Sequence, residues 1–264
     1  MTGAVAEGAA TWRARAAGAL CIVASLAAAA EPLPPLVQGP ALAGQSGQAG
    51  QGGQNEARLG PGWRVVGWPD QRMPLTRYAA EVIDGRLALR LDARASYGNL
   101  VHTLPAQAPP STLSWAWRMQ QPNPGADLRV KAGDDAAAKV CLGFDMALQR
   151  VPFVERTLLR VARSRSADPL PAATLCWVWG GVEAPGSAID NAYSRRVRYI
   201  VLRTAADATG TWLTETRDVA ADFRRAFGDE SPDTPAVTTV IVAADADNTG
   251  ASTVAHVADL RFSP

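Results

Sequence analysis

The stretch Arg86-Leu87-Ala88-Leu89-Arg90-Leu91, which follows an Asp84-Gly85 turn, gives the clearest indication of fold class. Its leucines recur at every second position, and this period is typical of a β-strand that buries one face. Asp-Gly is a common hairpin turn before such a strand. The same alternation appears over 111–119, where Leu113, Trp115 and Trp117 share one face. We therefore predict strands over 86–91 and 111–119.

Short apolar segments of this kind continue along the chain between Gly, Pro, Asn and Asp turns. The further predicted strands are 138–144, 173–179, 196–203, 212–216, 237–244 and 254–262. Six to nine short strands at this spacing favour an antiparallel β-sandwich. The predicted fold class is therefore all-β.

Two segments have a helical period instead. Residues 154–163 are apolar at 154, 158, 161 and 162, which predicts a helical insertion near 152–166. The opposite face carries Arg156, Arg160 and Arg163. This face is either a solvated surface or a surface that contacts an anionic glycan or lipid headgroups. A short helix over 218–227, capped by Asp218 and ended by Gly228, is expected to close one end of the sandwich.

The composition excludes several classes of function. The chain has 264 residues with a formal net charge of +1, so no overall basic field favours nucleic acid as a partner. His102 and His256 are the only histidines, which excludes a multi-histidine metal centre. No apolar segment reaches the roughly 18–20 residues that span a bilayer, so no transmembrane segment is expected after removal of the leader.

The first thirty residues have the order of regions found in a secretory signal peptide. A basic stretch, Trp12-Arg13-Ala14-Arg15, precedes a small apolar segment and then Ala28-Ala29-Ala30. An uncleaved anchor, a disordered leader and lipidation at Cys21 are the alternatives. The expected organisation is a signal peptide over 1–30, a disordered Pro/Gly/Gln-rich linker over 31–57 and one β-sandwich domain over 58–264. The expected location is periplasmic or secreted.

Two cysteines lie inside predicted strands. Cys141 and Cys176 form a disulfide if their strands are neighbours, as suits an exported protein. Two separately buried thiols are the alternative.

The segment Asp245-x-Asp247-x-Thr249-Gly250 resembles the first half of a calcium loop. Hard oxygen ligands at alternate positions before a glycine turn suit calcium, which is the one cofactor that we predict. Position twelve of such a loop is His256 instead of glutamate, which excludes a full helix-loop-helix site. An Asx/Gly hairpin turn and a ligand site without metal are the alternatives.

Aspartates and tryptophans supply the candidate binding chemistry. Asp134 or Asp135, together with Asp245 or Asp247, would make the carboxylate pair that glycoside hydrolysis needs. Ion pairs and turn hydrogen bonds are the structural alternative. Trp179 precedes two glycines and is the tryptophan expected at a rim, where its flat ring could stack on a sugar.

The chain also resembles a known family through an ordered set of motifs. These are Lys131-Ala132-Gly133-Asp134-Asp135, Ala173 to Gly180, Asn191-Ala192-Tyr193, Gly210-Thr211-Trp212, Glu215 to Val219, Asp222-Phe223, Phe227-Gly228, Asp245 to Gly250 and Ala258 to Phe262. The set is similar to the DUF3047 family of exported bacterial proteins of unknown function, over roughly residues 60–264. Cys176-Trp177 departs from the Tyr-Val-Trp pattern expected there. A looser resemblance to galactose-binding-like jelly rolls implies a jelly-roll arrangement.

These observations predict non-catalytic binding of a carbohydrate or another cell-envelope ligand. The expected ligand-binding residues are Lys131, Asp134, Asp135, Trp179, Asn191, Tyr193, Arg217 and Asp222. The expected metal ligands are Asp245, Asp247 and Thr249. One alternative is a glycan hydrolase that uses an aspartate pair, and the other is a structural or interaction protein of the envelope.

Overall fold

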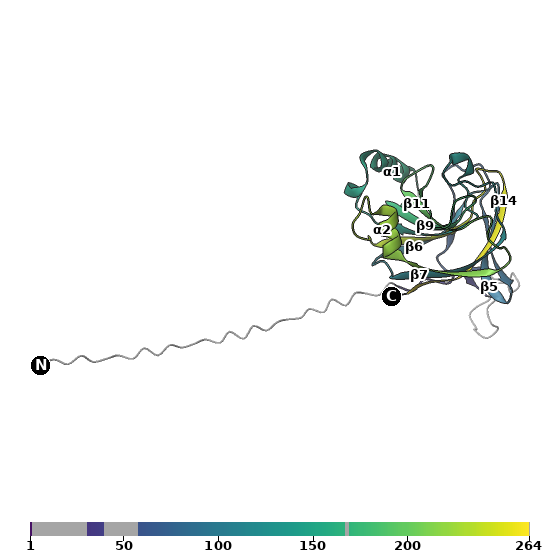
Figure 1. The fold of residues 1–264 in the computed structure, drawn as a ribbon, viewed down its shortest axis with the longest axis horizontal. Coiled ribbons are helices and arrows are strands. Elements are labelled where there is room, and N and C mark those ends of the chain that lie inside the picture. Colours follow the sequence, from purple (N-terminus) through teal and green to yellow (C-terminus); the bar gives the residue numbers. More distant parts are fainter. Residues whose placement is uncertain (2–30, 40–57, 167–168, 264) are drawn as a thin grey trace, which may run out of the picture.

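The protein, described here from a computed structural model, is a β-sandwich of two sheets (Figure 1). The structure describes residues 1, 31–39, 58–166 and 169–263. The seven-stranded sheet has the order β10-β11-β9-β8-β13-β6-β3, and the five-stranded sheet has the order β12-β7-β14-β5-β4. The predicted all-β class is confirmed.

The strands of the seven-stranded sheet are β10 (Ala188–Asp190), β11 (Val197–Arg203), β9 (Ala173–Trp179), β8 (Ala138–Phe144), β13 (Val237–Ala243), β6 (Asn99–Gln107) and β3 (Arg64–Val66). Those of the five-stranded sheet are β12 (Trp212–Asp218), β7 (Thr112–Gln121), β14 (Ser252–Ser263), β5 (Arg86–Arg94) and β4 (Arg77–Ile83). A separate pair joins β1 (Val37–Gln38) to β2 (Arg58–Leu59). One neighbouring pair, β9 and β11, runs parallel, and the other pairs are antiparallel.

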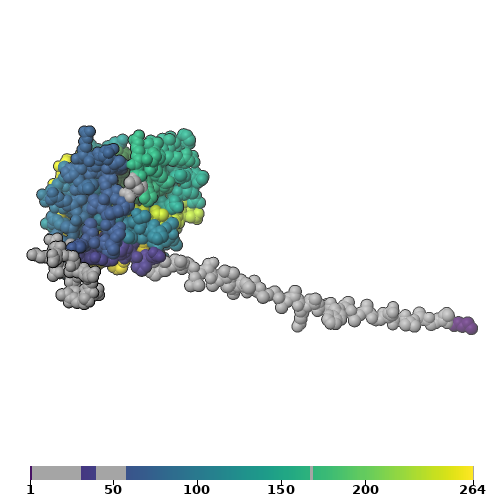
Figure 2. All heavy atoms as spheres, turned by 180° about the vertical axis from the view of Figure 1, so that it is seen from behind, coloured from purple at the N-terminus to yellow at the C-terminus, as the bar shows by residue number. Residues whose placement is uncertain are grey.

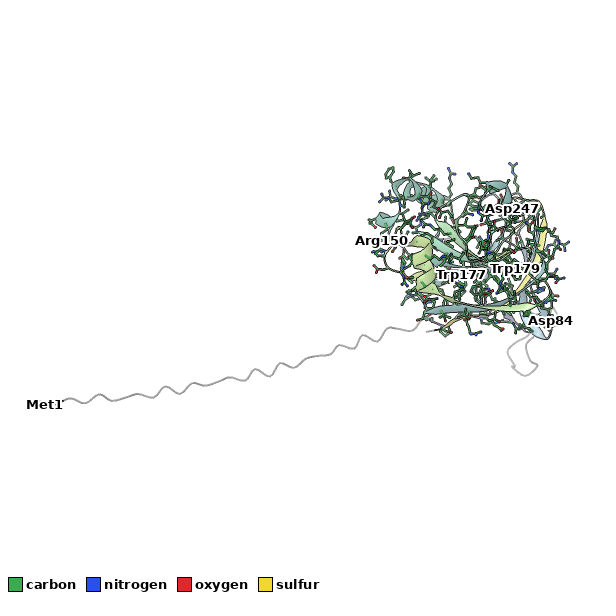
Figure 3. All side chains as sticks on the ribbon, viewed as in Figure 1. Met1, Asp84, Arg150, Trp177, Trp179 and Asp247 are labelled. Atoms are coloured by element: carbon green, nitrogen blue, oxygen red, sulfur yellow. A yellow bond between two sulfur atoms is a disulfide. The ribbon has the colours of Figure 1, made fainter. Side chains whose placement is uncertain are left out.

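Four tryptophans form the centre of the core between the sheets. Trp115 and Trp117 on β7 meet Trp177 and Trp179 on β9, with ring centroids 5.7 Å and 5.5 Å apart. All four are fully buried, and Figure 3 shows Trp177 and Trp179 inside the sandwich. The prediction that Trp179 lies at an exposed rim is therefore wrong. Its side chain points into the core, and its indole nitrogen donates to the backbone oxygen of Thr204 at 2.7 Å.

The N-terminal part of the domain differs from the prediction. Leu36 and Val37 are buried in the core, and β1 pairs with β2. Residues 31–39 therefore belong to the folded domain rather than to a disordered linker, because apolar side chains in this short stretch reach the core. The predicted signal peptide, apart from Met1, and the rest of the predicted linker, 40–57, lie outside the described residues.

Both predicted helices are present. α2 (Val219–Phe227) is capped by Asp218, whose side chain accepts from the backbone nitrogen of Ala221 at 2.8 Å. Phe223 and Phe227 bury their rings in the core, so α2 covers one side of the sandwich, as Figure 1 shows. Two short 3-10 turns also occur, η1 (Lys131–Gly133) and η2 (Leu148–Arg150).

The other helix, α1 (Phe153–Arg165), does not face the protein as its sequence pattern indicates. Val154, Leu158 and Val161 are exposed, and Leu159 is the residue that the helix buries. The physical reason is a set of polar contacts on the protein side, where Glu155 pairs with Arg196 at 3.4 Å. Among the described residues, no helix has the length and apolar character that crossing a membrane requires.

Candidate functional site

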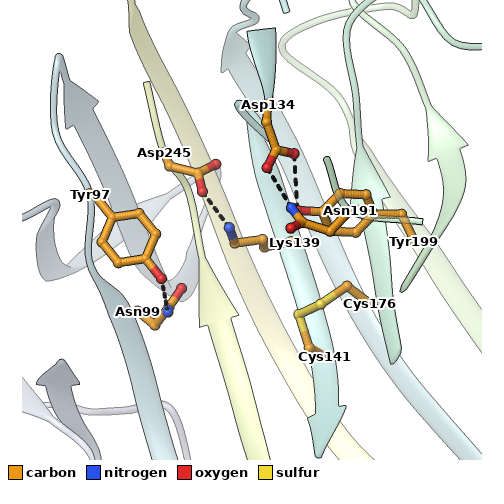
Figure 4. The surroundings of a disulfide bond; sticks show 9 residues. All are labelled: Tyr97, Asn99, Asp134, Lys139, Cys141, Cys176, Asn191, Tyr199 and Asp245. Atoms are coloured by element: carbon orange, nitrogen blue, oxygen red, sulfur yellow. Dashed lines mark hydrogen bonds and ion pairs between the residues drawn. A yellow bond between two sulfur atoms is a disulfide. The ribbon is translucent and has the colours of Figure 1, made fainter. Parts of the chain in front are cut away.

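A cavity of about 510 Å³ lies against the outer face of the seven-stranded sheet. Along each strand, every second side chain points away from the core toward this face. Cys141 on β8 and Cys176 on β9 are register partners and form a disulfide in the floor of the cavity, with Cα atoms 4.0 Å apart. The sequence predicted this disulfide on the condition that the two strands are neighbours. They are neighbours, and the disulfide is present (Figure 4).

The cavity is walled by loops from distant parts of the chain. Trp68 lines it from one part of the chain, and Leu170, Pro171 and Asn191 line it from another. Figure 2 shows these blue and green parts of the chain side by side on one face of the molecule. Asp247, which also lines the cavity, lies near the top of the molecule in Figure 3. The volume falls within the range of roughly 300–1,000 Å³ that is typical of small-molecule sites.

A buried ion pair stands at the centre of this face. The Nζ of Lys139, from β8, contacts Oδ2 of Asp245 (Figure 4). The second carboxylate oxygen accepts from the backbone nitrogen of Ala136 at 2.6 Å. Both side chains are almost completely buried. The Asp245 carboxylate raises the pKa of Lys139 well above its usual value, in spite of the opposing effect of burial. The contact between these two side chains holds the loop after β13 onto β8.

Asp134 brings a second carboxyl group to the cavity. It accepts hydrogen bonds from Nδ2 of Asn191 and from the Tyr199 hydroxyl, the latter at 3.2 Å. Burial raises the pKa of Asp134 to about 7, against the opposing effects of Lys139 and of these hydrogen bonds. A carboxyl group in this state changes charge near neutral pH, so it can either accept or donate a proton to a ligand.

The raised pKa of Asp134 predicts a pH dependence of stability. In the unfolded chain the group ionises near pH 4, so between about pH 4 and 7 the folded state binds more protons than the unfolded state. The contribution of Asp134 to the free energy of unfolding is therefore largest at low pH and decreases as the pH rises toward 7. We expect Asp134→Asn to flatten this decline and to be more stable than wild type at pH 8. The free energy of unfolding of both proteins is measured with urea from pH 4.5 to 8.5. The same pH dependence in the two proteins would contradict a raised pKa for Asp134.

Asp135, although adjacent, has a different role. Its carboxylate is fully buried and accepts from the backbone nitrogens of Asn248 and Thr249, at 3.1 and 2.8 Å, and from the Thr249 hydroxyl at 2.5 Å. It lies outside the cavity lining. Asp135, predicted to bind ligand, therefore acts here as an anchor for the 245–250 loop, which it fixes above the sheet.

The predicted calcium ligands fall into separate contacts. Asp245 pairs with Lys139, and Thr249 bonds to Asp135. Asp247 lines the cavity, its Oδ1 is buried without a hydrogen-bond partner among the described residues, and burial raises its pKa to about 6. Within the described ranges, no three His, Cys, Asp or Glu side chains group as metal ligands. Calcium binding stays a prediction, which thermal unfolding with calcium and with chelator tests.

Aromatic side chains stand at the opening of the cavity. Trp68, which is 57% exposed, stacks on Tyr97 with ring centroids 4.8 Å apart. Tyr193 is equally exposed. Its hydroxyl donates to Oδ1 of Asn248 at 2.6 Å and lies 3.1 Å from the backbone oxygen of Lys131. The Lys131 ammonium lies 5.2 Å from the Tyr193 ring centre. The opening thus combines flat apolar rings with amide groups.

The structure brings together part of the predicted ligand site. Asp134, Asn191 and Tyr193 line the cavity, and Lys131 contacts Tyr193. Arg217 and Asp222 do not join them. They form their own ion pair at 2.8 Å, and Asp222 also accepts from the indole of Trp177 at 2.7 Å, so they anchor α2 to the core.

Sequence reasoning missed several residues of the cavity. They include Trp68, Tyr97, Asn99, Lys139 and Tyr199. Lys139 could have been identified from the sequence as a candidate site residue, because it is one of only two lysines and interrupts the apolar strand Ala138–Phe144. The indication for Trp68 was weaker: it is a large aromatic residue in a turn-rich stretch beside Pro69 and Asp70.

Comparison with known proteins gives a family and distant structural likenesses. The sequence matches the family model described as "Protein of unknown function (DUF3047)" over residues 61–261. No protein with a curated description matches it. The cleaved adhesin domain of Lys-gingipain is similar in structure, with a TM-score of 0.34 and 8% identity, over 88% of this chain and 98% of that one. Endoglucanase 3 of Trichoderma harzianum, a family 12 glycoside hydrolase, gives a TM-score of 0.39 and 11% identity, over 76% and 89%.

Proposed function

Because the chain belongs to the DUF3047 family of proteins of unknown function, we propose its function from the cavity itself: it binds a carbohydrate of the cell envelope without breaking it. The observation that carries this proposal is the pairing of exposed aromatic rings with amide and carboxyl groups at one opening. Trp68 and Tyr193 provide apolar faces on which a pyranose ring can stack. Asn99, Asn191 and Asp134 provide hydrogen-bonding groups suited to sugar hydroxyls.

The unsatisfied oxygen of Asp247 supports a polar ligand in particular. A buried oxygen without a partner costs free energy, and a ligand hydroxyl that donates to it removes that cost. The apolar side of the cavity, from Leu170, Pro171 and Ile241, suits the C–H faces of a sugar. The signal peptide that the sequence predicts supports a location in the envelope or outside the cell.

Hydrolysis of a glycan is the second candidate, and one observation favours it. Asp134 and Asp247 line the same cavity, with pKa values raised to about 7 and about 6. Two carboxyl groups with raised pKa values are the kind of groups that act as general acid and base in glycoside hydrolysis. However, the Asp134 carboxylate already accepts hydrogen bonds from Asn191 and Tyr199, which suits binding.

A glycan panel distinguishes the two functions. Thermal unfolding of wild type is measured with each glycan, because a ligand that binds only the folded state raises the midpoint with its concentration. We expect a shift with at least one envelope glycan and a reduced shift in Trp68→Ala, which loses the stacking face. Each mixture is then separated by chromatography. New products that disappear with Asp134→Asn would favour hydrolysis, and the absence of any shift would contradict carbohydrate binding.

A further inference from the structure

The outward face of α1 is apolar, which is unusual for a helix on a globular domain. Phe153, Val154, Leu158 and Val161 are between 46% and 74% exposed. A surface helix normally turns such residues toward the core, and here Leu159 alone of the helix is buried. The helix stands on the outer side of the seven-stranded sheet in Figure 1. The exposure of these four side chains places them at the surface of the molecule.

Specific contacts hold the helix in this orientation. Glu155 pairs with Arg196, whose guanidinium also donates to Glu230 at 2.6 and 2.7 Å. Arg163 donates from Nε to the backbone oxygen of Leu170 at 2.8 Å. Because these contacts all lie on the protein side, rotating the helix to bury its apolar residues would break them. The exposed apolar face is therefore a fixed feature of the fold.

Positive charge borders this apolar face. Arg160 and Arg165 are exposed, and the Arg156 guanidinium lies 5.9 Å from the ring centre of Phe153. Glu155 is the only acidic residue of the helix, and it is engaged by Arg196 on the protein side. An apolar face bordered by arginines is the pattern of helices that lie in the interface of an anionic membrane.

We propose that α1 docks the protein on an anionic phospholipid bilayer, with its axis in the plane of the surface. Anionic headgroups would neutralise the arginines, whereas a second copy of this chain would bring arginine against arginine. The four apolar side chains would enter the boundary between headgroups and acyl chains. Since Leu170 lines the cavity and is bonded to Arg163, the docked helix would hold the cavity beside the bilayer.

Vesicle co-sedimentation tests the proposal with the full chain. The vesicles are phosphatidylcholine alone, or phosphatidylcholine with about a third phosphatidylglycerol, at low salt. We expect binding to the anionic vesicles, weakened about tenfold by the double variant Val154→Ser/Leu158→Ser, which removes apolar contact with the lipid. The variant Arg156→Gln/Arg160→Gln should weaken it by about fivefold for each arginine removed.

The matched control is Val82→Ser/Val182→Ser, which replaces two exposed apolar residues outside α1. It should bind as wild type does. The masses of all proteins are measured, so that wild type and variants are compared with the same N-terminal residues before Glu31. The unfolding midpoint of each protein shows that it is folded. Equal binding by the α1 variants and the control, or no preference for anionic vesicles, would overturn the proposal. So would a dimer in sedimentation velocity that the α1 variants disperse, because a second copy would then cover this face.

Discussion

Lys139→Met is expected to destabilise the protein by about 3–5 kcal/mol, because it leaves the Asp245 carboxylate buried without its partner. The side chains have similar length, so the change removes the charge and keeps most of the volume. The loop after β13 loses its anchor on β8, and with it the position of Asp247 in the cavity. Urea unfolding at pH 7 measures the loss.

Two further variants separate this effect from a general one. Lys131→Met changes the other lysine, which is exposed, and should cost less than about 1 kcal/mol. The double variant Lys139→Met/Asp245→Leu removes both charges and should recover a large part of the loss. A single Lys139→Met variant that unfolds at the same urea concentration as wild type would show that the ion pair does not hold this loop.

Loss of the Cys141–Cys176 disulfide is the second large expected effect. The bond closes a loop with a sequence separation of 35 residues, for which the entropy of the unfolded chain predicts about 3–4 kcal/mol of stabilisation. Cys141→Ala/Cys176→Ala is therefore expected to unfold at a clearly lower urea concentration than the oxidised wild type.

Reduced wild type is the matched control for this variant. It has the same side chains as the oxidised protein but lacks the bond, so it should lose a similar free energy without the cavity that alanine leaves. If only the alanine variant were destabilised, packing in the cavity floor, rather than the covalent bond, would be the source of the stability.

Two of the predicted strands show most clearly why alternation worked, since each turns one apolar face to the core. Arg86–Arg94 and Thr112–Gln121 alternate because their leucines and tryptophans point inward and their polar residues outward. β4 and β6 escaped prediction for a physical reason. β4 is an edge strand that buries no residue fully, and β6 buries only Leu100 and Leu104, so neither shows a strong apolar period.

The cavity was harder to predict than the fold, because it depends on contacts between distant loops. Lys139 and Asp245 are 106 residues apart in the sequence, and Asp134 and Asn191 are 57 apart. A single sequence does not show which loops meet. The adjacent residues Asp134 and Asp135 illustrate the difficulty, since one lines the cavity and the other anchors a loop.

The tryptophans show the same limit. Trp179 and Trp68 both stand beside turn residues, yet one is fully buried and the other exposed. The alternation of β9 places Trp177 and Trp179 on the same face, but it does not show whether that face looks inward. The inward direction is set by the five-stranded sheet, whose Trp115 and Trp117 pack against them.

Isothermal titration of the strongest glycan from the panel tests carbohydrate binding at the cavity most directly. Wild type, Trp68→Ala and Phe153→Ala are titrated side by side, because Trp68 and Phe153 are both exposed aromatics and only Trp68 lines the cavity. We predict saturable one-to-one binding by wild type and Phe153→Ala, and binding about tenfold weaker by Trp68→Ala, as expected for a residue central to a binding site. Equal affinity in all three proteins, or no saturable heat in any of them, would contradict a carbohydrate site at this cavity.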